Sequence, residues 1–325
     1  MSPSQLPLFT ALTYFILSCL YDIFLHSLAR FPGPLYHRAS ILPWAYLVFR
    51  GTLAFQVVEL HNKYGPVVRL SPSHLGFSDP QAWKDVFGVT PGGENLKYRG
   101  LYRSMTSGVS DSFLAADTAQ HRYMRGLVAP GFTARSIVAQ EGQIMAYVDL
   151  LMYQLRNRST NGSVMDVSQW FNWTTFDVIC DLTLGDSLHC LENAETHMYL
   201  KFTHVFSEYS MKGAVLWHLG RNIAFTRSSN VSVCWETGEN FRWHQSALGP
   251  QEVIGTANLF MVAGSDTTAS SLTFFTYYMV TNTGYMSRLT DEIGSTFESD
   301  DQIDLDKTAS LPYLNACIKE MQVDG

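Results

Sequence analysis

The sequence has little charge and few cysteines, and both shortages exclude classes of function. Charged residues make up 16% of the 325 residues, and the formal net charge is −7. No basic stripe stands out against this acidic balance, so the chain lacks the electrostatic footprint of a protein that binds nucleic acid. The cysteines show no C-x-x-C spacing, which indicates neither a zinc site nor a disulfide framework and favours a reducing compartment; they are Cys19, Cys180, Cys190, Cys234 and Cys317.

Hydrophobic residues, by contrast, make up 46% of the chain, which is enough for one large domain or two ordinary ones. The apolar stretch from Leu6 to Leu28 would span roughly 35 Å as a helix, which is long enough to cross a bilayer. No Lys or Arg precedes it, whereas Arg30 and Arg38 follow it. This asymmetry predicts a membrane anchor over residues 1–29, with the body of the protein on the cytoplasmic side.

A cleaved signal peptide is the alternative, because Ser27-Leu28-Ala29 offers small residues at a plausible cleavage site. The length of the apolar segment and the lack of a basic n-region argue against it. Four Asn-x-Ser/Thr triplets would be glycosylation sites only in that secreted case; they begin at Asn157, Asn161, Asn172 and Asn230.

Local signals predict a hairpin and two short helices after the anchor. Prolines on both sides of Gly33 favour a stiff turn, and a helix in residues 57–64 should end at Gly65-Pro66. Two short apolar runs around Ser71-Pro72-Ser73 then predict a β-hairpin. The next helix should begin at Asp79 as N-cap, with Pro80 in its first turn. Its apolar residues are spaced to face a core; they are Trp83, Val86 and Phe87.

The stretch "ADTAQHRYMRGLVAPGF" predicts a helix that presents two potential anion-binding side chains together. Asp117 and Gln120 have the spacing of a capping box, and Pro130-Gly131 provides a stop. His121 and Arg125 are four residues apart, so they lie on one helical face and can bind an anion together. A solvated basic face without a specific ligand is the alternative. Residues 211–247 show no clear period, and no structure is predicted for them.

The stretch "FMVAGSDTTASS" places a single acid, Asp266, in a run that is free of charge from Val253 to Ser287. A helix of about thirty residues should begin near Pro250, and its apolar character on all sides predicts that it is buried. Five poor helix formers from Gly264 to Thr268 predict a kink or local widening at its middle. A second membrane helix with a polar lesion is the alternative.

These motifs together resemble the cytochrome P450 monooxygenases, in particular the membrane-bound fungal-type members. The stretch from Ala263 to Thr268 is similar to the Ala/Gly-Gly-x-Asp/Glu-Thr-Thr/Ser motif of their long central helix. His121-x-x-x-Arg125 resembles the helix whose Arg pairs with a haem propionate. "KYGPVVRLSPSHLGFSD" and "SLPYLNACIKE" look like further family segments, the latter leading to a Glu-x-x-Arg motif at Glu320. Only about residues 211–247 lie outside the resemblance.

The resemblance implies a mainly α fold with a small β-sheet, composed of the anchor and a family domain over residues 30–325. It implies haem b as cofactor, a lipophilic small-molecule substrate of secondary metabolism, NADPH-cytochrome P450 reductase as partner, and a single-pass location in the endoplasmic reticulum membrane. Asp266 would relay protons, Thr267 would hydrogen-bond the oxygen and its water, and Gly264 would leave room beside the haem. Further cofactor contacts are implied for His121, Arg125, Ala263 and Thr268.

Two departures from the family pattern lead us to expect an inactive, truncated form. The Arg of the Glu-x-x-Arg motif is replaced by Val323, so Glu320 lacks its usual partner. The Phe-x-x-Gly-x-Arg-x-Cys loop, whose thiolate binds the iron, is absent from the sequence, and without that thiolate oxygen activation is lost. No metal ligand is therefore assigned, and stable haem binding by this chain is not expected. The alternative is a membrane-anchored, non-catalytic protein that binds a lipophilic ligand or a partner.

Overall fold

The computed structural model describes residues 6–88, 113–114, 116–160, 164–203 and 250–324, with residues 95, 162, 205, 209, 212–213 and 215–216 described in isolation. The chain forms two compact units, and each is described by itself. The first unit comprises Met1–Gly108 and Ser207–Val231, and the second comprises Val109–Phe206 and Ser232–Gly325. The unpatterned segment 211–247 lies almost wholly outside the described residues.

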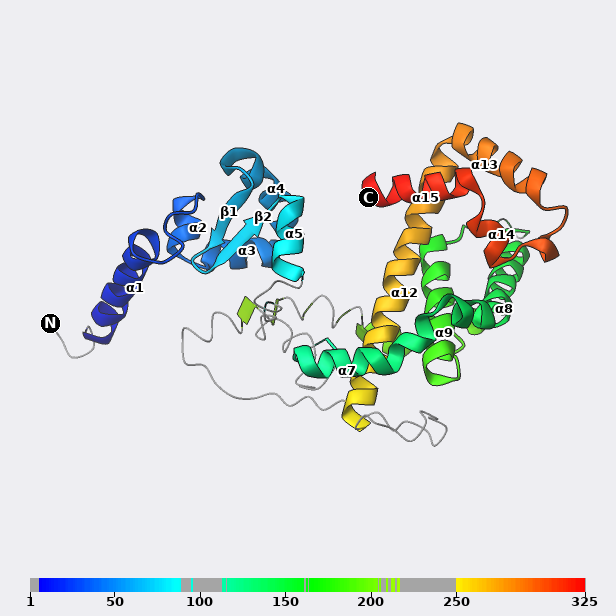
Figure 1. The fold of residues 1–325 in the computed structure, drawn as a ribbon, viewed down its shortest axis with the longest axis horizontal. Coiled ribbons are helices and arrows are strands. Elements are labelled where there is room, and N and C mark those ends of the chain that lie inside the picture. Colours follow the sequence, from blue (N-terminus) through cyan, green and yellow to red (C-terminus); the bar gives the residue numbers. More distant parts are fainter. Residues whose placement is uncertain are drawn as a thin grey trace. The chain divides into compact units, whose positions relative to one another are not determined.

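The first unit contains one β-hairpin with the helices α2 to α5 near it, and a longer helix, α1, at its N-terminal end (Figure 1). Its two antiparallel strands pair Val67 with Phe77 and Arg69 with Leu75, as the hairpin prediction required. The turn between them occupies the predicted Ser71–Ser73 position. The elements are α1 (Leu6–Phe24), α2 (Leu35–Ala39), α3 (Leu42–Arg50), α4 (Leu53–Tyr64), β1 (Val67–Ser71), β2 (His74–Phe77) and α5 (Pro80–Phe87).

Two arginines, Arg69 on β1 and Arg38 on α2, donate hydrogen bonds to the C-terminal end of α1. Arg69, which is fully buried, donates from Nη1 to the carbonyl of Asp22 at 2.8 Å and from Nη2 to the carbonyl of Pro72 at 2.6 Å. Arg38 donates to the carbonyl of Ile23 at 2.9 Å. The last carbonyls of a helix have no partner within it and carry a partial negative charge, so cationic donors stabilise this end.

The described residues contain no helix that is both long enough and apolar enough to cross a membrane. The predicted apolar segment does form a helix, α1, but the prediction of a transmembrane anchor over residues 1–29 gains no support from it. Apolar side chains on α1 are exposed, with Phe9 57% and Leu17 60% accessible.

The prediction for α5 is right about its start and wrong about its face. The Asp79 carboxylate accepts the Gln81 amide at 2.8 Å, which is the predicted N-cap, and Pro80 is the first helical residue. Trp83 and Phe87, however, are 70% and 67% exposed, and Val86 is 37% exposed. The two rings contact each other at 4.7 Å between centroids. Apolar spacing identified one side of the helix, but no described element covers that side.

The second unit contains helices and no strands where it is described, and its longest helix, α12, packs against α9 (Figure 1). With the hairpin of the first unit, this confirms a mainly α fold with a small β-sheet. Its elements are α7 (Thr118–Val128), the 3-10 turn η1 (Ala129–Phe132), α8 (Ala134–Ser159), α9 (Val167–Leu184), α10 (Cys190–Asn193), α12 (Pro250–Thr281), α13 (Thr283–Thr296), η2 (Asp300–Gln302), α14 (Leu305–Ala309) and α15 (Pro312–Asp324).

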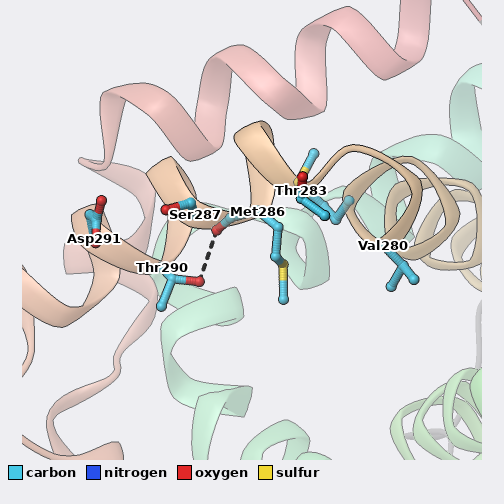
Figure 2. Close-up of a pocket in the computed structure, with 7 residues that line it drawn as sticks. Val280, Thr283, Met286, Ser287, Thr290 and Asp291 are labelled. Atoms are coloured by element: carbon cyan, nitrogen blue, oxygen red, sulfur yellow. Dashed lines mark hydrogen bonds between the residues drawn. The ribbon is translucent and has the colours of Figure 1, made fainter.

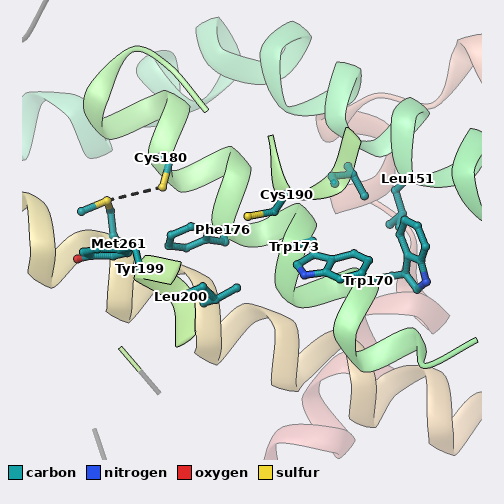
Figure 3. Close-up of a cluster of buried hydrophobic side chains, with 10 residues drawn as sticks. Leu151, Trp170, Trp173, Phe176, Cys180, Cys190, Tyr199, Leu200 and Met261 are labelled. Atoms are coloured by element: carbon teal, nitrogen blue, oxygen red, sulfur yellow. Dashed lines mark hydrogen bonds between the residues drawn. The ribbon is translucent and has the colours of Figure 1, made fainter. Parts of the chain in front are cut away.

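The main hydrophobic core of this unit lies where α9 packs between α8, α10 and α12 (Figure 3). Phe176, at its centre, is 1% exposed and stacks against Tyr199 at 5.8 Å between ring centroids. Trp170 and Trp173 form an edge-to-face pair at 4.9 Å. Met261 brings α12 into the same cluster. Aromatic side chains bury large apolar areas, so this cluster dominates the packing energy of the unit.

A buried acid, Asp177, connects α9 to the start of α10. Its two carboxylate oxygens accept the backbone amides of Cys190 at 3.2 Å and Leu191 at 2.8 Å. These amides belong to the first turn of a helix, where no intrahelical acceptor exists. Desolvation by burial nevertheless raises the pKa of Asp177 above its usual value, although the amide donors oppose this shift.

Candidate active-site helix

The helix α12 carries most of the candidate site residues and runs without interruption from Pro250 to Thr281. The predicted local widening at its middle is not present, because every residue of this range is α-helical. Its hydroxyl side chains instead donate to the carbonyl one turn earlier: Ser265 to Met261 at 2.7 Å and Thr267 to Ala263 at 2.7 Å. Such back-bonding satisfies the hydroxyls inside the helix, so they do not compete for its backbone amides.

Only one side of α12 is buried among the described residues, which corrects the prediction of a helix buried on all sides. Four of its buried residues recur every four positions on the side that faces α9; they are Ala257, Met261, Ser265 and Ala269, and Thr256 and Met279 are buried as well. This spacing is the ridge by which one helix packs against another. Because apolar residues are spread evenly around this helix, the sequence did not indicate which side packs against α9 and which side is exposed.

The exposed side of α12 carries the chemistry-bearing residues. Asp266, Thr267 and Thr268 are all exposed, as is Ala263 one turn before Thr267. With about 100° of rotation per residue, Asp266 and Thr267 lie about 100° and 200° around the helix from buried Ser265. Because the Thr267 hydroxyl donates to Ala263, its oxygen remains available to accept a hydrogen bond from another group.

Gly264 lies against α9. A Cβ built at this position would be 2.9 Å from Cγ1 and 3.0 Å from Cδ1 of Ile179. The two helices therefore approach so closely here that a side chain at position 264 would have to displace Ile179. The role of Gly264 in leaving room beside a haem remains a prediction. In the structure, a glycine is needed at this position because α12 and α9 pack so closely.

The helix α7 carries His121 and Arg125 and has the predicted start. The Asp117 carboxylate accepts the Gln120 amide at 2.9 Å. The Gln120 side chain does not turn back to complete a capping box; its Nε2 donates to Glu252 at the beginning of α12, at 2.7 Å. This bond joins α7 to the N-terminal end of the helix that bears Asp266.

Aromatic contacts place His121 near the same end of α12, while Arg125 is exposed. The rings of His121 and Phe113 meet edge to face at 4.6 Å between centroids. Phe113 and Phe132 in turn lie 6.2 and 5.6 Å from Phe260 on α12. Six residues separate Phe260 from Asp266, which is about 9 Å along the helix axis. The structure thus brings α7 to the helix of Asp266, one to two turns before the acid.

Glu320 is exposed on α15, whose start is fixed by a different acid. Glu292, on α13, accepts the Tyr313 and Leu314 amides through its two oxygens at 2.8 and 2.9 Å. Arg288 lies over the Tyr313 ring at 4.5 Å from its centroid. The family role implied for Glu320 is not tested by these contacts, and sequence patterns had not singled out Glu292 as the residue that anchors α15.

The thiols of Cys180, Cys190 and Cys317 are in surroundings that do not favour the role of a haem ligand. Cys180 and Cys190 belong to the hydrophobic core, and Cys180 Sγ lies 3.6 Å from Met261 Sδ. Burial raises the pKa of Cys190 to about 11 and also raises that of Cys180, so the thiolate that iron requires is disfavoured. Cys317 is half-buried on α15, in a helix and not in a loop. Cys234 lies outside the described residues.

A pocket of about 330 Å³ opens at the junction of α12 and α13, away from the candidate residues (Figure 2). Met279, Met286 and Asp291 are among the side chains that line it. Met279 follows Asp266 by thirteen residues, or about 20 Å along the helix axis. The pocket is therefore separate from the exposed face around Asp266.

Comparison with known proteins gives one consistent result. The sequence model of the family described as Cytochrome P450 matches residues 34–230 and 236–322. The chain is 31% identical to the cytochrome P450 monooxygenase tpeC of Talaromyces stipitatus, over 94% of this chain and 66% of that protein. It is 32% identical to the versicolorin B desaturase stcL of Emericella nidulans, over 97% and 70% of the respective chains. It is 29% identical to the trichothecene C-15 hydroxylase of Fusarium sporotrichioides, over 96% and 69%.

Proposed function

Because the chain belongs to the cytochrome P450 family, we propose that it supplies the oxygen-side helix of a monooxygenase that acts on a lipophilic small molecule of secondary metabolism. The observation that carries this proposal is the exposed pairing of Asp266 and Thr267 on the unpacked side of α12. The relatives named as a desaturase and a C-15 hydroxylase support oxidative chemistry on such molecules. NADPH-cytochrome P450 reductase is the proposed electron donor.

In this proposal Asp266 holds and transfers a proton, and Thr267 orients its acceptor. An exposed carboxylate can exchange protons with water, and it stands one residue before a hydroxyl whose oxygen can still accept a hydrogen bond. Ala263 and Thr268 border this pair on the same exposed side of the helix. His121 and Arg125 are proposed to bind an anionic group of the cofactor, with Arg125 accessible to it.

We further propose that a polypeptide of these 325 residues does not by itself carry out oxygenation. The chain spans about two thirds of the length of the relatives it matches. The proposal is supported by the described thiols, which are buried in the core or held in helices. A non-catalytic protein that binds a lipophilic ligand remains the second candidate, and the same lack of a suitable thiol favours it.

The decisive measurement is the absorption spectrum of the purified 325-residue protein after haem addition, reduction and exposure to carbon monoxide. We expect no red-shifted Soret band, because that band needs a thiolate ligand, and no NADPH-dependent hydroxylation with reductase present. Appearance of the band would overturn the proposed inactivity. Substituting each cysteine in turn, beginning with Cys317, would then identify the ligand. Specific binding of a lipophilic ligand without haem would favour the second candidate.

The genomic sequence beyond the codon for Gly325 provides a complementary test. If it encodes a cysteine loop joined to this chain, the longer protein should show the red-shifted band. In that protein Asp266→Asn should lower the rate of hydroxylation by about a hundredfold or more, since general acid catalysis contributes at least this much. Unchanged hydroxylation in that variant, with the band intact, would refute the role of Asp266.

Membrane attachment through residues 1–29, at the cytoplasmic face of the endoplasmic reticulum, is also proposed. Its support is the set of exposed apolar side chains on α1, such as Phe15 and Leu20, which water solvates poorly. The protein should float with membranes and stay accessible to added protease, whereas a variant lacking residues 1–29 should not float. Forms sensitive to an endoglycosidase would contradict this orientation.

A further inference from the structure

A hydrogen bond between helices reaches the backbone directly before Asp266. The hydroxyl of Thr175, on α9, lies 3.0 Å from the carbonyl oxygen of Ser265 and 2.9 Å from that of Phe171, one turn earlier in its own helix. Thr175 is 8% exposed and Ser265 2% exposed, so no solvent competes at this contact. A third, longer contact of 3.3 Å reaches the carbonyl oxygen of Asn172. A hydroxyl has a single proton, so these carbonyls share it, and the Ser265 oxygen uses its second lone pair for this bond.

A steric contact lies beside this hydrogen bond. Ile179 follows Thr175 by four residues and therefore lies on the same face of α9. Its Cγ1 and Cδ1 atoms occupy the space that a Cβ at Gly264 would need. Thr175 thus contacts Ser265, and Ile179 lies against Gly264. These are the two residues that directly precede Asp266 in α12.

These two contacts restrict the orientation of the acid. The carbonyl of Ser265 and the amide of Asp266 belong to one planar peptide group, so a bond to the carbonyl also holds the amide plane. The Ile179 contact at Gly264 prevents α12 from turning about its axis toward α9. The directions in which Asp266 and Thr267 project then follow, because their angles around the helix relative to Ser265 are set by helical geometry.

We propose that Thr175 is a positioning residue for Asp266 and Thr267, acting through the Ser265 carbonyl with Ile179 as its steric support. The inference rests on the proposed function only in assigning chemistry to Asp266 and Thr267. The contact between Thr175 and Ser265 does not depend on the proposed function. No sequence motif marks Thr175, which is separated from Ser265 by ninety positions.

The neighbouring residue provides a matched control. Thr174 is also a buried threonine of α9, at 6% exposure, but its hydroxyl donates at 2.8 Å to Trp170 within the same helix. Thr174→Val and Thr175→Val each remove one buried hydroxyl and keep the β-branched shape. Only Thr175→Val removes a bond to α12. A purely structural contribution of a buried threonine predicts the same outcome for both.

The experiment is amide hydrogen exchange of the purified 325-residue protein, resolved by peptide mass spectrometry. We expect Thr175→Val to increase exchange in residues 262–270 about two- to tenfold, the factor that corresponds to losing one hydrogen bond. Thr174→Val should leave this segment unchanged relative to the rest of the protein. Thr175→Ser, which retains the hydroxyl and removes the methyl group, should restore wild-type exchange in the segment.

Three results would overturn the inference. Equal increases in both valine variants would assign the effect to general destabilisation, and a uniform increase across all peptides would do the same. Failure of Thr175→Ser to restore protection would show that the methyl group matters and the hydroxyl does not. The carbon monoxide spectrum tests the proposed function separately. Failure of this inference therefore appears in the hydrogen exchange, and failure of the proposed function appears in the spectrum.

Discussion

The two sides of α12 contrast sharply although they belong to one continuous helix. The side facing α9 is packed so tightly that Gly264 has no room for a Cβ, whereas the side bearing Asp266 is exposed. Both sides contain small and hydroxyl-bearing residues, and hydropathy does not tell them apart. What separates them is the partner helix, because burial is a property of the contact between two elements and not of either alone.

This contrast explains how one helix can serve stability and chemistry together. The packed ridge holds the helix in place, and the Ser265 hydroxyl is satisfied within the protein. The exposed side can then carry a carboxylate without the cost of burying an unpaired charge. Substitutions on the two sides should therefore have very different effects on folding, and the following predictions are ordered from the largest effect to the smallest.

The largest effect is expected from Phe176→Ala, at the centre of the core that α9 shares with α12. Phe176 is 1% exposed, and its removal loses the transfer free energy of the ring and leaves a cavity, which together cost about 3–5 kcal/mol of unfolding free energy. Phe274→Ala removes an identical ring from α12 that is 51% exposed, and should change stability by about 0.5 kcal/mol or less. Denaturant unfolding of both variants provides the comparison; similar losses would contradict it.

Gly264→Val should destabilise the protein by about 1–3 kcal/mol, because the new side chain collides with Ile179. Helix propensity favours valine over glycine, so the loss must come from the contact between helices. Ala263→Val, on the exposed side, is the control and should have little effect. Combining Gly264→Val with Ile179→Ala should recover part of the lost stability in thermal unfolding, and additive losses would show that the two residues do not interact.

A smaller, pH-dependent effect is expected at Asp177, the buried acid of α9. Desolvation raises its pKa in the folded state above the unfolded value. The folded protein therefore binds this proton more tightly, and the stability contributed is fully present below the unfolded pKa and is lost as pH rises through the folded pKa. The stability of the wild type relative to Asp177→Asn should decline over that range, as measured by urea unfolding. A difference that stays constant with pH would contradict the shift.

The smallest effect on folding is expected at the proposed proton-transfer residue. Asp266→Asn changes an exposed side chain for which the structure shows no packing role, so unfolding free energy should change by about 0.5 kcal/mol or less. Chemical denaturation gives the unfolding free energies of this variant and of Phe176→Ala, and so compares the exposed side of α12 with the packed core. A loss comparable to that of Gly264→Val would mean that Asp266 has a structural role.

Local signals in the sequence predicted the beginnings and ends of elements well. Asp79 and Asp117 were predicted as caps, and both accept the expected backbone amides. The hairpin around Ser71–Ser73 and the start of the long helix at Pro250 were confirmed. These features depend on residues within one turn of each other, so the information lies in a few neighbouring positions.

The predictions that failed concern which side of a helix meets which neighbour. Apolar spacing placed Trp83 and Phe87 against a core, yet both are exposed among the described residues. Hydropathy predicted a fully buried α12, and poor helix formers predicted a kink or local widening at its middle; the helix is α-helical throughout and packs on one side. The hydroxyls of Ser265 and Thr267 donate to carbonyls one turn earlier in the same helix.

The sequence by itself determined the family, through the motif from Ala263 to Thr268 in its long helix, and the fold class that accompanies it. It also determined which positions can cap, turn or carry charge, because those are properties of single residues and their immediate neighbours. Only the tertiary structure decided that Gly264 and Ser265 face α9 while Asp266 faces outward. That choice depends on contacts with Thr175 and Ile179, far away along the chain, which exist only once two helices have packed together.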